Sequence, residues 1–442
     1  MNFQVVVLAG GLSKTMYPLV SKDVPKALLP VGNRPLLSYV LELVEASNIK
    51  DIIVVVSGDD AALCVGNWVT EAFHDRLRVE VSGVSEDLDT AEALRAVSHL
   101  LTADDFLVVS GDLVCDVPVG AVAAAHRRQG ALVTALLWPH PSTPNSETAS
   151  GDKTKQPTTF DIIGLNSTHQ QLLYVSTGMQ SARDFQVRSS LLRAVGQMEI
   201  RTDLVDAHLY AFNRLLVQGV LESRPGQKSI KHDLVPYLVR SQLGLGVSST
   251  IVGSPLEDRV ENVNHLLDAE AFGKNRLQVA HSGLKCSTYI ASKDRYCSRV
   301  NSLQAYLDVN RDLAGPEAIH LTGYTVSTQN NVIHETSEMG WKSTVGPYCM
   351  LGDGSTLGER CSIKRSVVGR HCRIGSNVKI INSVVMNYVT VEDGSLIQNS
   401  IICSNVILQE RSMLKDCQVG PGYVVGPRME IKGEALAKKE KL

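Results

Sequence analysis

Apolar and polar positions follow two different patterns along this chain of 442 residues. In the first half, short aliphatic runs alternate with stretches in which apolar residues recur every three or four positions. These patterns predict buried strands and amphipathic helices, respectively. The predicted strands lie at 5–8, 51–56, 77–81 and 106–109, and the predicted helices at 36–44, 61–73 and 91–101. Nearly continuous aliphatic strands separated by helices indicate an α/β domain with a mostly parallel sheet and helices on both faces.

The middle of the chain continues this pattern and then loses it. Strand-like sequence returns near Ile162 and Leu172 and again at 205–212, and a helix containing Leu215 follows. The segment 139–159 is rich in Ser, Thr, Pro and Lys, so we expect an exposed, flexible loop, with a modification or docking site as the alternative. Weak patterning over 241–283 predicts a linker with a short helix near 263–272. A strand at 286–290 and a helix at 302–313 then lead to the last domain.

In the last hundred residues, aliphatic residues recur every five or six positions. After Ile363 the steps are five, six and six, which gives a repeat of 17 residues. The positions are Val345, Leu351, Leu357, Ile363, Val368, Ile374, Ile380, Val385, Val391, Ile397, Ile402, Leu408, Leu414 and Val419, and Ile333 and Met339 extend the phase backward. Hexapeptide repetition predicts a parallel β-helix whose aliphatic side chains point inward. Residues 345–424 would form about five coils, roughly 20 to 25 Å tall.

Three features of this predicted β-helix bear on its structure and its role. Small residues after the aliphatic positions suit the corners, namely Gly346, Gly352, Gly358, Gly369 and Gly375. An open-ended β-helix also leaves unpaired strand edges, which favours an assembly role. His334 and His371 are candidates for the corner histidine that serves as a base in β-helical acyltransferases, and the alternative for both is a solvated corner residue.

These patterns divide the chain into four parts. We expect an α/β domain over 1–240, a linker and bridging segment over 241–332, the β-helix over 333–425 and a charged, flexible tail over 426–442.

Composition excludes several classes of function. The net charge of −3 and the pI near 6.5 provide no global attraction to polyanions, so neither a direct nucleic-acid partner nor a membrane partner is expected. The start lacks a basic signal-peptide region and no apolar run is long enough to span a bilayer, so we expect a cytosolic protein. The nine cysteines contain no C-x-x-C pair, which favours scattered buried thiols over a zinc or disulfide framework.

Candidate chemistry begins directly after the first strand. Gly10 and Gly11 end that strand and Lys26 follows a polar loop, a combination that suits a phosphate, although a tight turn is the alternative for the glycines. Asp112 comes directly after the strand at 106–109. Because ligands of parallel sheets bind beyond the carboxyl ends of the strands, Asp112 is placed to hold a magnesium ion that bridges phosphates. The alternative is a helix N-cap or turn aspartate.

The loop text LAGG, followed by PKALLPV, resembles the signature of the sugar-phosphate nucleotidyltransferases. The resemblance implies a Rossmann-like nucleotidyltransferase domain, a metal-binding role for Asp112 and a second acidic position at Asp233. Ser13 stands where the family has its third glycine, and Thr15 where it has the arginine that holds pyrophosphate. Lys14 could replace that arginine only through a shift in register, and it lacks the bidentate fork.

The segment DTAEAL departs from the same family in its first residue. Asp89 stands where the family has a glycine close to the nucleotide, and a carboxylate there adds bulk and repulsion. With Ser13 and Thr15 it makes three eroded positions, and the sugar-contacting E-K-P motif is not found between 160 and 200. We therefore expect a vestigial pocket of Gly10, Gly11, Lys26, Asp112 and Asp233, with no catalytic residue, no cofactor and no bound metal.

Longer stretches resemble the family of gamma subunits of eukaryotic translation initiation factor 2B, which joins a nucleotidyltransferase-like domain to a left-handed β-helix. They include VDAHLYAF, DLVPYLVRSQL, CSRVNSLQAYLDVNRD, SIKRSVVGRHCRIGSNVKIINSVVMN and EDGSLIQNSIICSN. The resemblance implies a regulatory subunit that pairs with the epsilon subunit and supports GDP-to-GTP exchange on initiation factor 2. The sequence ends without the helical domain that carries exchange in the epsilon family, so we expect weak or no intrinsic exchange activity.

The sequence leaves three other functions open. An active nucleotidyltransferase that makes a nucleotide sugar would rest on Gly10, Gly11, Lys26 and Asp112. A β-helical acyltransferase would need an active histidine. A ligand sensor would retain the pocket without turnover.

Overall fold

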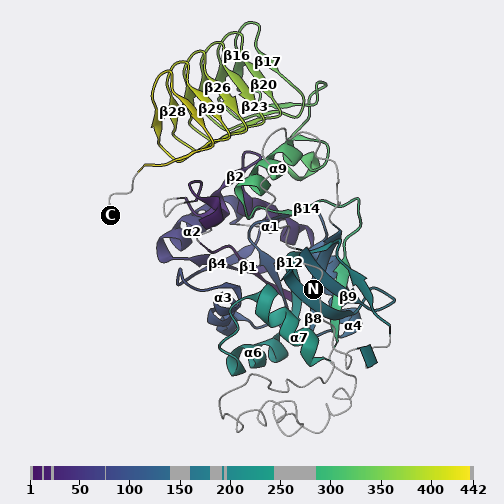
Figure 1. Cartoon of the computed structure of the whole chain (residues 1–442). Helices are drawn as coiled ribbons and strands as arrows, with labels where there is room; N and C mark the ends of the chain where they lie inside the picture. Colours follow the sequence, from purple (N-terminus) through teal and green to yellow (C-terminus); the bar gives the residue numbers. More distant parts are fainter. Residues whose placement is uncertain are drawn as a thin grey trace.

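The computed structural model describes residues 3–11, 14–20, 24–74, 76–139, 160–179, 192–193, 197–242 and 285–438. Ser13, the loop 140–159, most of the predicted linker and the last four residues lie outside these ranges. Figure 1 shows an α/β domain below and a β-helix above, with helix α9 between them. No helix among the described residues is both long and apolar enough to cross a bilayer.

A seven-stranded sheet with the order β13-β8-β12-β6-β1-β4-β5 forms the centre of the α/β domain. Its strands are β1 (Phe3–Leu8), β4 (Asp51–Ser57), β5 (Arg78–Val84), β6 (Asp105–Ser110), β8 (Val133–Pro139), β12 (Leu204–Asn213) and β13 (Cys286–Ile290). Strand β1 is parallel to β4 and β6, β4 to β5, and β8 to β13, whereas β12 is antiparallel to both β6 and β8. The prediction of a mostly parallel sheet is confirmed.

Helices cover both faces of this sheet, as the alternating pattern predicts. One face packs against α1 (Leu36–Ala46), α2 (Asp59–Phe73) and α4 (Val119–Gln129), and the other against α3 (Thr90–Ala96), α6 (Arg214–Ser223) and α7 (Val235–Ser241). Within β1, Val5 and Val7 belong to the first core, and Val6 belongs to the second. This division follows from the two-residue period of a strand.

Shorter elements complete the domain. The strands are β2 (Pro30–Val31) with β3 (Arg34–Pro35), β7 (Leu113–Cys115) with β14 (Cys297–Arg299), and β9 (Phe160–Leu165) with β10 (Leu172–Met179) and β11 (Glu199–Arg201). The short helical turns are η1 (Lys14–Met16), η2 (Lys26–Leu28), η3 (Ser98–Leu100), η5 (Ile230–Leu234) and η7 (Ile319–Leu321). Of the cysteines, eight are buried and Cys64 is exposed, so the expectation of buried thiols fails at that one position.

The segment predicted to bridge the domains belongs partly to the first of them. Strand β13 pairs with β8 in the large sheet, and β14 pairs with β7. The α/β domain therefore takes strands from both sides of the linker and does not end near residue 240. The bridge proper is α9 (Leu303–Ala314) with η7. Ser302 begins α9 by accepting a hydrogen bond from the Ala305 amide, as an N-cap residue does.

The C-terminal part is a three-sided parallel β-helix. The first face consists of β15 (Val332–Ile333), β18 (Met350–Leu351), β21 (Val367–Val368), β24 (Val384–Val385), β27 (Ile401–Ile402), β30 (Gln418–Val419) and β33 (Ala435–Leu436). The second consists of β16 (Glu338–Met339), β19 (Thr356–Leu357), β22 (Arg373–Ile374), β25 (Thr390–Val391), β28 (Ile407–Leu408) and β31 (Val424–Val425). The third consists of β17 (Thr344–Val345), β20 (Ser362–Lys364), β23 (Lys379–Ile381), β26 (Leu396–Gln398), β29 (Met413–Lys415) and β32 (Glu430–Lys432).

The six-residue phase predicts the interior of this β-helix correctly. Every aliphatic residue placed inward between Val345 and Val419 is buried. The stack is longer than predicted, because its first face has seven strands and is roughly 29 Å tall at about 4.8 Å per strand. Strands β32 and β33 pair with β29 and β30, so the expectation of a flexible tail from 426 is wrong for 430–436.

The corners are built differently from the prediction. The left-handed corner residues are mostly asparagine, arginine and aromatic side chains stacked 17 residues apart, such as Asn382 and Asn399, each with φ of 48°. The predicted corner glycines serve close packing between coils instead. A Cβ on Gly352 would lie 2.6 Å from the carbonyl carbon of Gly369, and one on Gly358 would lie 2.6 Å from that of Gly375.

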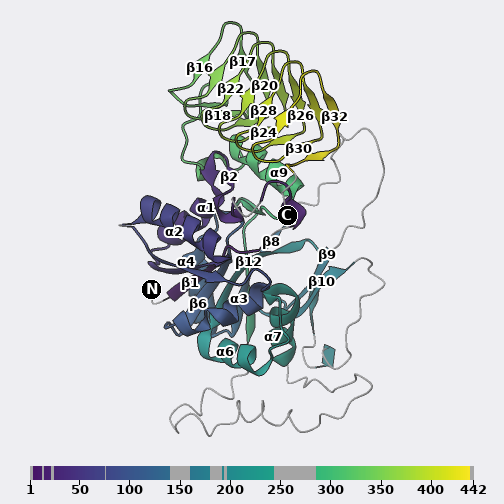
Figure 2. The same ribbon diagram turned by 90° about the vertical axis from the view of Figure 1, so that its left-hand side faces the viewer.

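The first face of the β-helix rests on the rest of the molecule. Its outward side chains Met350, Val367, Val384 and Ile401 are buried. They belong to one apolar cluster with Tyr306, Val309 and Leu313 of α9 and with Met16 and Leu19 of the N-terminal loop. Figure 2 shows this face turned toward α9 and the α/β domain. The two domains therefore share a core.

Candidate functional site

A cleft of about 150 Å³ opens at the carboxyl ends of β1, β4 and β6. Most of the residues predicted for the pocket line it. The lining includes Gly10, Gly11, Lys26, Asp89 and Asp112, together with Ser57, Thr90, Ser110 and Arg299. The cleft lies where ligands of parallel sheets bind.

The two glycines shape the floor of this cleft. Gly11 has φ of 101°, a conformation that favours glycine, and its amide donates a hydrogen bond of 2.8 Å to Ser57 Oγ. A Cβ on Gly10 would lie 2.5 Å from the same hydroxyl. The close approach of the loop to β4 therefore requires glycine at position 10, and the positive φ favours glycine at position 11.

Asp112 is bound on all sides by side chains of this chain. Its Oδ2 lies 2.6 Å from Lys26 Nζ, and its Oδ1 accepts from Arg299 Nε at 2.8 Å and from Ser110 Oγ at 2.7 Å. Arg299 Nη2 donates a second bond to Oδ2 at 3.1 Å, which makes the pair bidentate. The side chain of Asp112 is only 5% exposed.

Electrostatics fix the charge of this group. Burial alone would raise the pKa of Asp112, but the charges of Arg299 and Lys26 outweigh it and hold the pKa well below its usual range. Burial likewise tends to lower the pKa of Arg299, and the charge of Asp112 raises it again. Asp112 is therefore a buried anion, and Arg299, whose side chain is 22% exposed, is its cationic partner.

This arrangement does not fit the magnesium ion that the resemblance implies at Asp112. Magnesium requires free carboxylate oxygens, and both oxygens of Asp112 already bind cationic side chains. Within the described residues, no three His, Cys, Asp or Glu side chains come together in a way that could hold a metal ion. The guanidinium of Arg299 provides the positive charge that balances this carboxylate.

The sequence patterns do not predict Arg299 as a residue of the cleft. It ends β14, and register places it opposite Leu113, the residue after Asp112. Asp112 and Arg299 are 187 residues apart in the sequence, and no local pattern connects them. Its one signal in the sequence is its place in CSRVNSLQAYLDVNRD, a stretch that carries the family resemblance.

Two departures from the nucleotidyltransferase signature have structural partners. Thr15 Oγ1 donates a hydrogen bond of 2.8 Å to the carbonyl of Asn301, close to Arg299. Asp89 is the N-cap of α3: its carboxylate accepts from the Thr90 amide at 2.6 Å, and Glu92 completes a capping box. Asp89 thus has two roles, because it lines the cleft and also caps helix α3. The third departure, Ser13, lies outside the described residues.

Asp233 and the candidate histidines lie elsewhere. Asp233 does not line the cleft; its carboxylate accepts from the amides of Lys228 and Ser229 at 3.0 and 2.9 Å, so it closes a turn. His334 lies 3.5 Å from Asp353 at a corner of the β-helix. His371 stacks on Tyr388 at another corner, with 5.3 Å between ring centroids. Neither histidine lines the cleft.

A second hollow of about 110 Å³ adjoins the cleft on the other side of Gly10, Gly11 and Lys26. Asp59, Asp60 and Glu86 line it. Carboxylates on this side, with Asp89 on the other, disfavour a polyanionic ligand.

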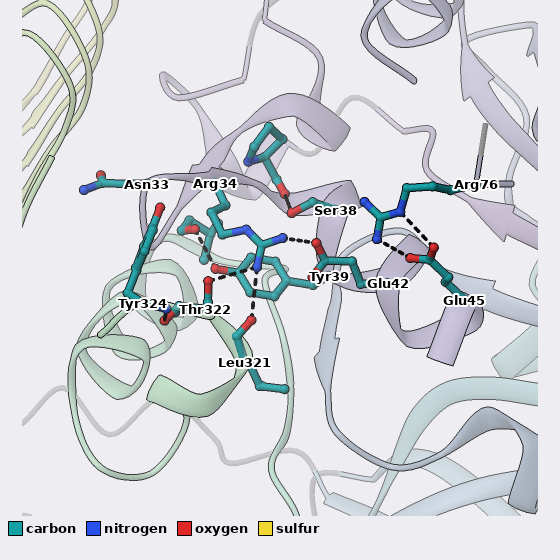
Figure 3. A network of polar contacts seen from close by, with 12 residues as sticks. Asn33, Arg34, Ser38, Tyr39, Glu42, Glu45, Arg76, Leu321, Thr322 and Tyr324 are labelled. Atoms are coloured by element: carbon teal, nitrogen blue, oxygen red, sulfur yellow. Dashed lines mark hydrogen bonds and ion pairs between the residues drawn. The ribbon is translucent and has the colours of Figure 1, made fainter. Parts of the chain in front are cut away.

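The chain that follows Lys26 is tied to the bridge and the β-helix. The Gly32 amide donates to Asn310 Oδ1 at 2.8 Å, and Asn33 Nδ2 donates to the Val368 carbonyl at 2.9 Å. Figure 3 shows Arg34 between Glu42 and the carbonyls of Leu321 and Thr322. Arg34 Nη1 donates hydrogen bonds to these carbonyl oxygens, at 3.2 Å for Leu321 and 3.1 Å for Thr322. The residues directly after PKALLPV thus form an interdomain contact.

Two family models match the two parts of this chain. The family model "Nucleotidyl transferase" matches residues 4–147, and the model "EIF2B subunit epsilon LbH domain", a left-handed β-helix, matches residues 328–431. The chain is 31% identical to translation initiation factor eIF2B subunit gamma of Dictyostelium discoideum over 397 residues, which cover 84% of this chain and 88% of that protein. The chain belongs to the eIF2B gamma-subunit family.

Two further relatives of this eIF2B gamma-family chain differ in how much of it they match. The eIF2B subunit gamma of Schizosaccharomyces pombe is 29% identical over 368 residues, covering 82% of this chain and 74% of that protein. A mannose-1-phosphate guanyltransferase of Aspergillus fumigatus is 31% identical, but over 130 residues that cover 29% of this chain and 35% of that enzyme. The likeness to eIF2B gamma subunits spans both domains, whereas the likeness to this enzyme is partial.

Proposed function

We propose that this chain is a non-catalytic, regulatory subunit of the eIF2B guanine-nucleotide exchange complex in the cytosol. It pairs with the epsilon subunit and the other subunits and supports exchange of GDP for GTP on initiation factor 2. Membership of the gamma-subunit family, over both domains, supports the assignment to the complex.

The occupation of Asp112 by Lys26 and Arg299 supports the absence of catalysis. An active nucleotidyltransferase needs a carboxylate that is free to hold a metal ion and cations that are free to hold phosphate. Here both cations bind the single carboxylate, and the cluster keeps one net positive charge. Acidic side chains on both sides of Gly10 and Gly11 further disfavour a nucleotide.

An exchange assay tests the proposed function. Initiation factor 2 loaded with a fluorescent GDP would be mixed with this chain alone, the epsilon chain alone, or the two co-expressed. We expect no exchange from this chain alone and faster exchange from the pair than from epsilon alone. Clean separation of the two co-expressed chains on gel filtration would contradict the proposal.

The second candidate is an active sugar-phosphate nucleotidyltransferase. It is favoured by the presence of Gly10, Gly11, Lys26 and Asp112 in one cleft and by the match of residues 4–147 to that family. Pyrophosphate release from a nucleoside triphosphate, a sugar 1-phosphate and magnesium decides between the two. We expect none; release that Asp112→Asn abolishes would establish the enzyme. Calorimetry with GTP or GDP-mannose separately tests a ligand sensor.

A further inference from the structure

Cys115 and Cys297 face one another across the short strands β7 and β14. The two strands are antiparallel, and their register places Cys297 directly opposite Cys115. The Asp116 amide donates to the Tyr296 carbonyl at 3.1 Å, just outside the two cysteines, which therefore form a non-hydrogen-bonded pair. The Cα atoms of such a pair lie about 4.5 Å apart, and disulfides form at Cα separations of about 4.4 to 6.8 Å. The backbone thus already has a spacing that a disulfide accepts.

The two thiols also interact directly. The Cys297 side chain forms a hydrogen bond with that of Cys115, and this bond, together with burial, raises the pKa of Cys297. The Cys115 sulfur in addition accepts a hydrogen bond of 3.3 Å from the Val117 amide. Hydrogen bonds donated to a sulfur favour its thiolate form. Cys115 is therefore the better nucleophile of the pair, and Cys297 is the thiol that keeps its proton.

This pairing sets the two residues apart from the other cysteines. Among the strand pairs that the structure describes, only this one places two cysteines in register; Cys286, for example, lies opposite Val133. Cys115 and Cys297 are each 3% exposed, so a bulky reagent does not reach them in the folded state. Hydrogen peroxide is hardly larger than water. The strands β7 and β14 form a two-stranded sheet of their own, so no further strand covers the pair at either edge.

We propose that Cys115 and Cys297 are an oxidation site that hydrogen peroxide converts into a reversible cross-strand disulfide. The Cys115 thiolate attacks one peroxide oxygen, the O–O bond breaks, and a sulfenic acid and hydroxide form. This hydroxide takes up the proton that Cys115 released. The Cys297 sulfur then attacks the sulfenic sulfur: the S–S bond forms, the S–O bond breaks, and the departing hydroxide leaves as water with the Cys297 proton. The two sulfurs lose one electron each, and the peroxide is reduced to two molecules of water.

The disulfide would fasten together the two segments that meet at the cleft. Asp112 directly precedes β7, Arg299 ends β14, and β14 leads into α9 and the β-helix. A covalent bond between residues so far apart in the sequence restricts the unfolded chain. We therefore expect the oxidised protein to resist unfolding more than the reduced protein. The attachment of β14 would then depend less on the ion pair of Arg299 with Asp112.

Thiol titration and peptide mapping test the oxidation site. The full-length chain with Cys64→Ser, which removes the exposed thiol and leaves eight cysteines, would be treated with hydrogen peroxide and then denatured. We expect the number of titratable thiols to fall from eight to six and to return to eight with dithiothreitol. A tryptic digest without reductant should contain one cross-linked peptide that joins Cys115 to Cys297. The midpoint of urea unfolding should rise on oxidation and fall back on reduction.

Two serine variants in the same background serve as test and control. Cys297→Ser should lose both the cross-link and the shift in the urea midpoint. Cys286→Ser, at a fully buried position with no cysteine opposite, should keep both. The peptide map of the protein with both cysteines intact does not depend on how well either variant folds.

Three results would overturn the inference. They are a thiol count that stays at eight, a cross-link between other cysteines, and a sulfinic acid at Cys115 without a cross-link. None of them bears on the proposed function, which the exchange assay tests separately.

Discussion

At the scale of single residues, Asp112 joins three segments that are far apart in the sequence. Lys26 comes from η2, Asp112 from the end of β6 and Arg299 from β14. A buried ion pair contributes little net stability, because desolvation offsets the attraction, but loss of one partner leaves an uncompensated buried charge. The retention of Lys26 and Asp112 is therefore explained without catalysis.

We predict that Arg299→Ala lowers the free energy of unfolding of the α/β domain by about 3 kcal/mol, the low end for a broken buried pair, because Lys26 still contacts Asp112. Urea unfolding followed by circular dichroism measures the change. Arg299→Lys keeps the charge but loses the bidentate fork. Its free energy of unfolding should therefore lie between those of the wild type and Arg299→Ala. An alanine variant as stable as the wild-type chain would show that Arg299 is not a structural residue.

The lowered pKa of Asp112 predicts a dependence of stability on pH. A carboxylate with a lower pKa in the folded state contributes fully above its unfolded pKa, about 3.9, and the contribution is lost as the pH falls from there toward the folded pKa. The urea midpoint should hold near neutral pH and decline below about pH 4. Asp112→Asn should show a shallower decline, and an identical acid profile for both proteins would contradict the assignment.

How much of the cleft could be predicted depends on which contacts are local. The sequence predicts Gly10, Gly11 and Asp112, because strand ends mark the ligand edge of a parallel sheet. It does not predict Arg299, because pairing across 187 residues leaves no periodic trace. Only its order in the chain and its apolar flanks assign Asp233 to the pocket, and neither of these fixes where its side chain lies. Its carboxylate closes its own turn instead.

At the scale of elements, the β-helix shows what a repeat can and cannot reveal. The inward positions followed from the period, because burial selects aliphatic side chains at every coil. The corners did not, because glycine has two uses, a left-handed backbone and close packing, and the sequence does not distinguish them. Asparagine instead takes left-handed corners and forms a ladder: Asn382 Nδ2 donates to Asn399 Oδ1 at 2.8 Å, and Asn399 Nδ2 to Asp416 Oδ1 at 3.1 Å.

This ladder predicts a difference between two substitutions at one corner. Asn399→Gly removes the ladder bonds but keeps a residue suited to φ of 48°. Asn399→Val removes the same bonds and also forces a β-branched residue into the left-handed region. This backbone strain should lower the free energy of unfolding by about 1–2 kcal/mol more than Asn399→Gly does. Thermal unfolding of the β-helix should rank wild type above glycine and glycine above valine. Equal stability of the two variants would show that backbone conformation does not govern the corner.

At the scale of the whole molecule, the N-terminal signature segment has become part of a shared core. Met16 and Leu19 pack in one cluster with α9 and the first face of the β-helix, and Asn33 bonds directly to β21. The segment that resembles the nucleotidyltransferase signature thus packs against the β-helix in this chain. The orientation of the β-helix relative to the α/β domain then depends on this core.

Two isoleucines of one coil test this dependence. Ile401 and Ile407 both point outward and begin adjacent strands, but Ile401 is fully buried against the rest of the molecule and Ile407 is 39% exposed. Ile401→Asp places a carboxylate in the shared core, which costs several kcal/mol unless the β-helix moves away. We expect small-angle scattering to show a larger radius of gyration for Ile401→Asp and an unchanged one for Ile407→Asp. Because both variants keep the inward side chains of the coil, the β-helix itself should retain its circular dichroism. An unchanged radius for Ile401→Asp would mean that contacts other than this face hold the two domains together.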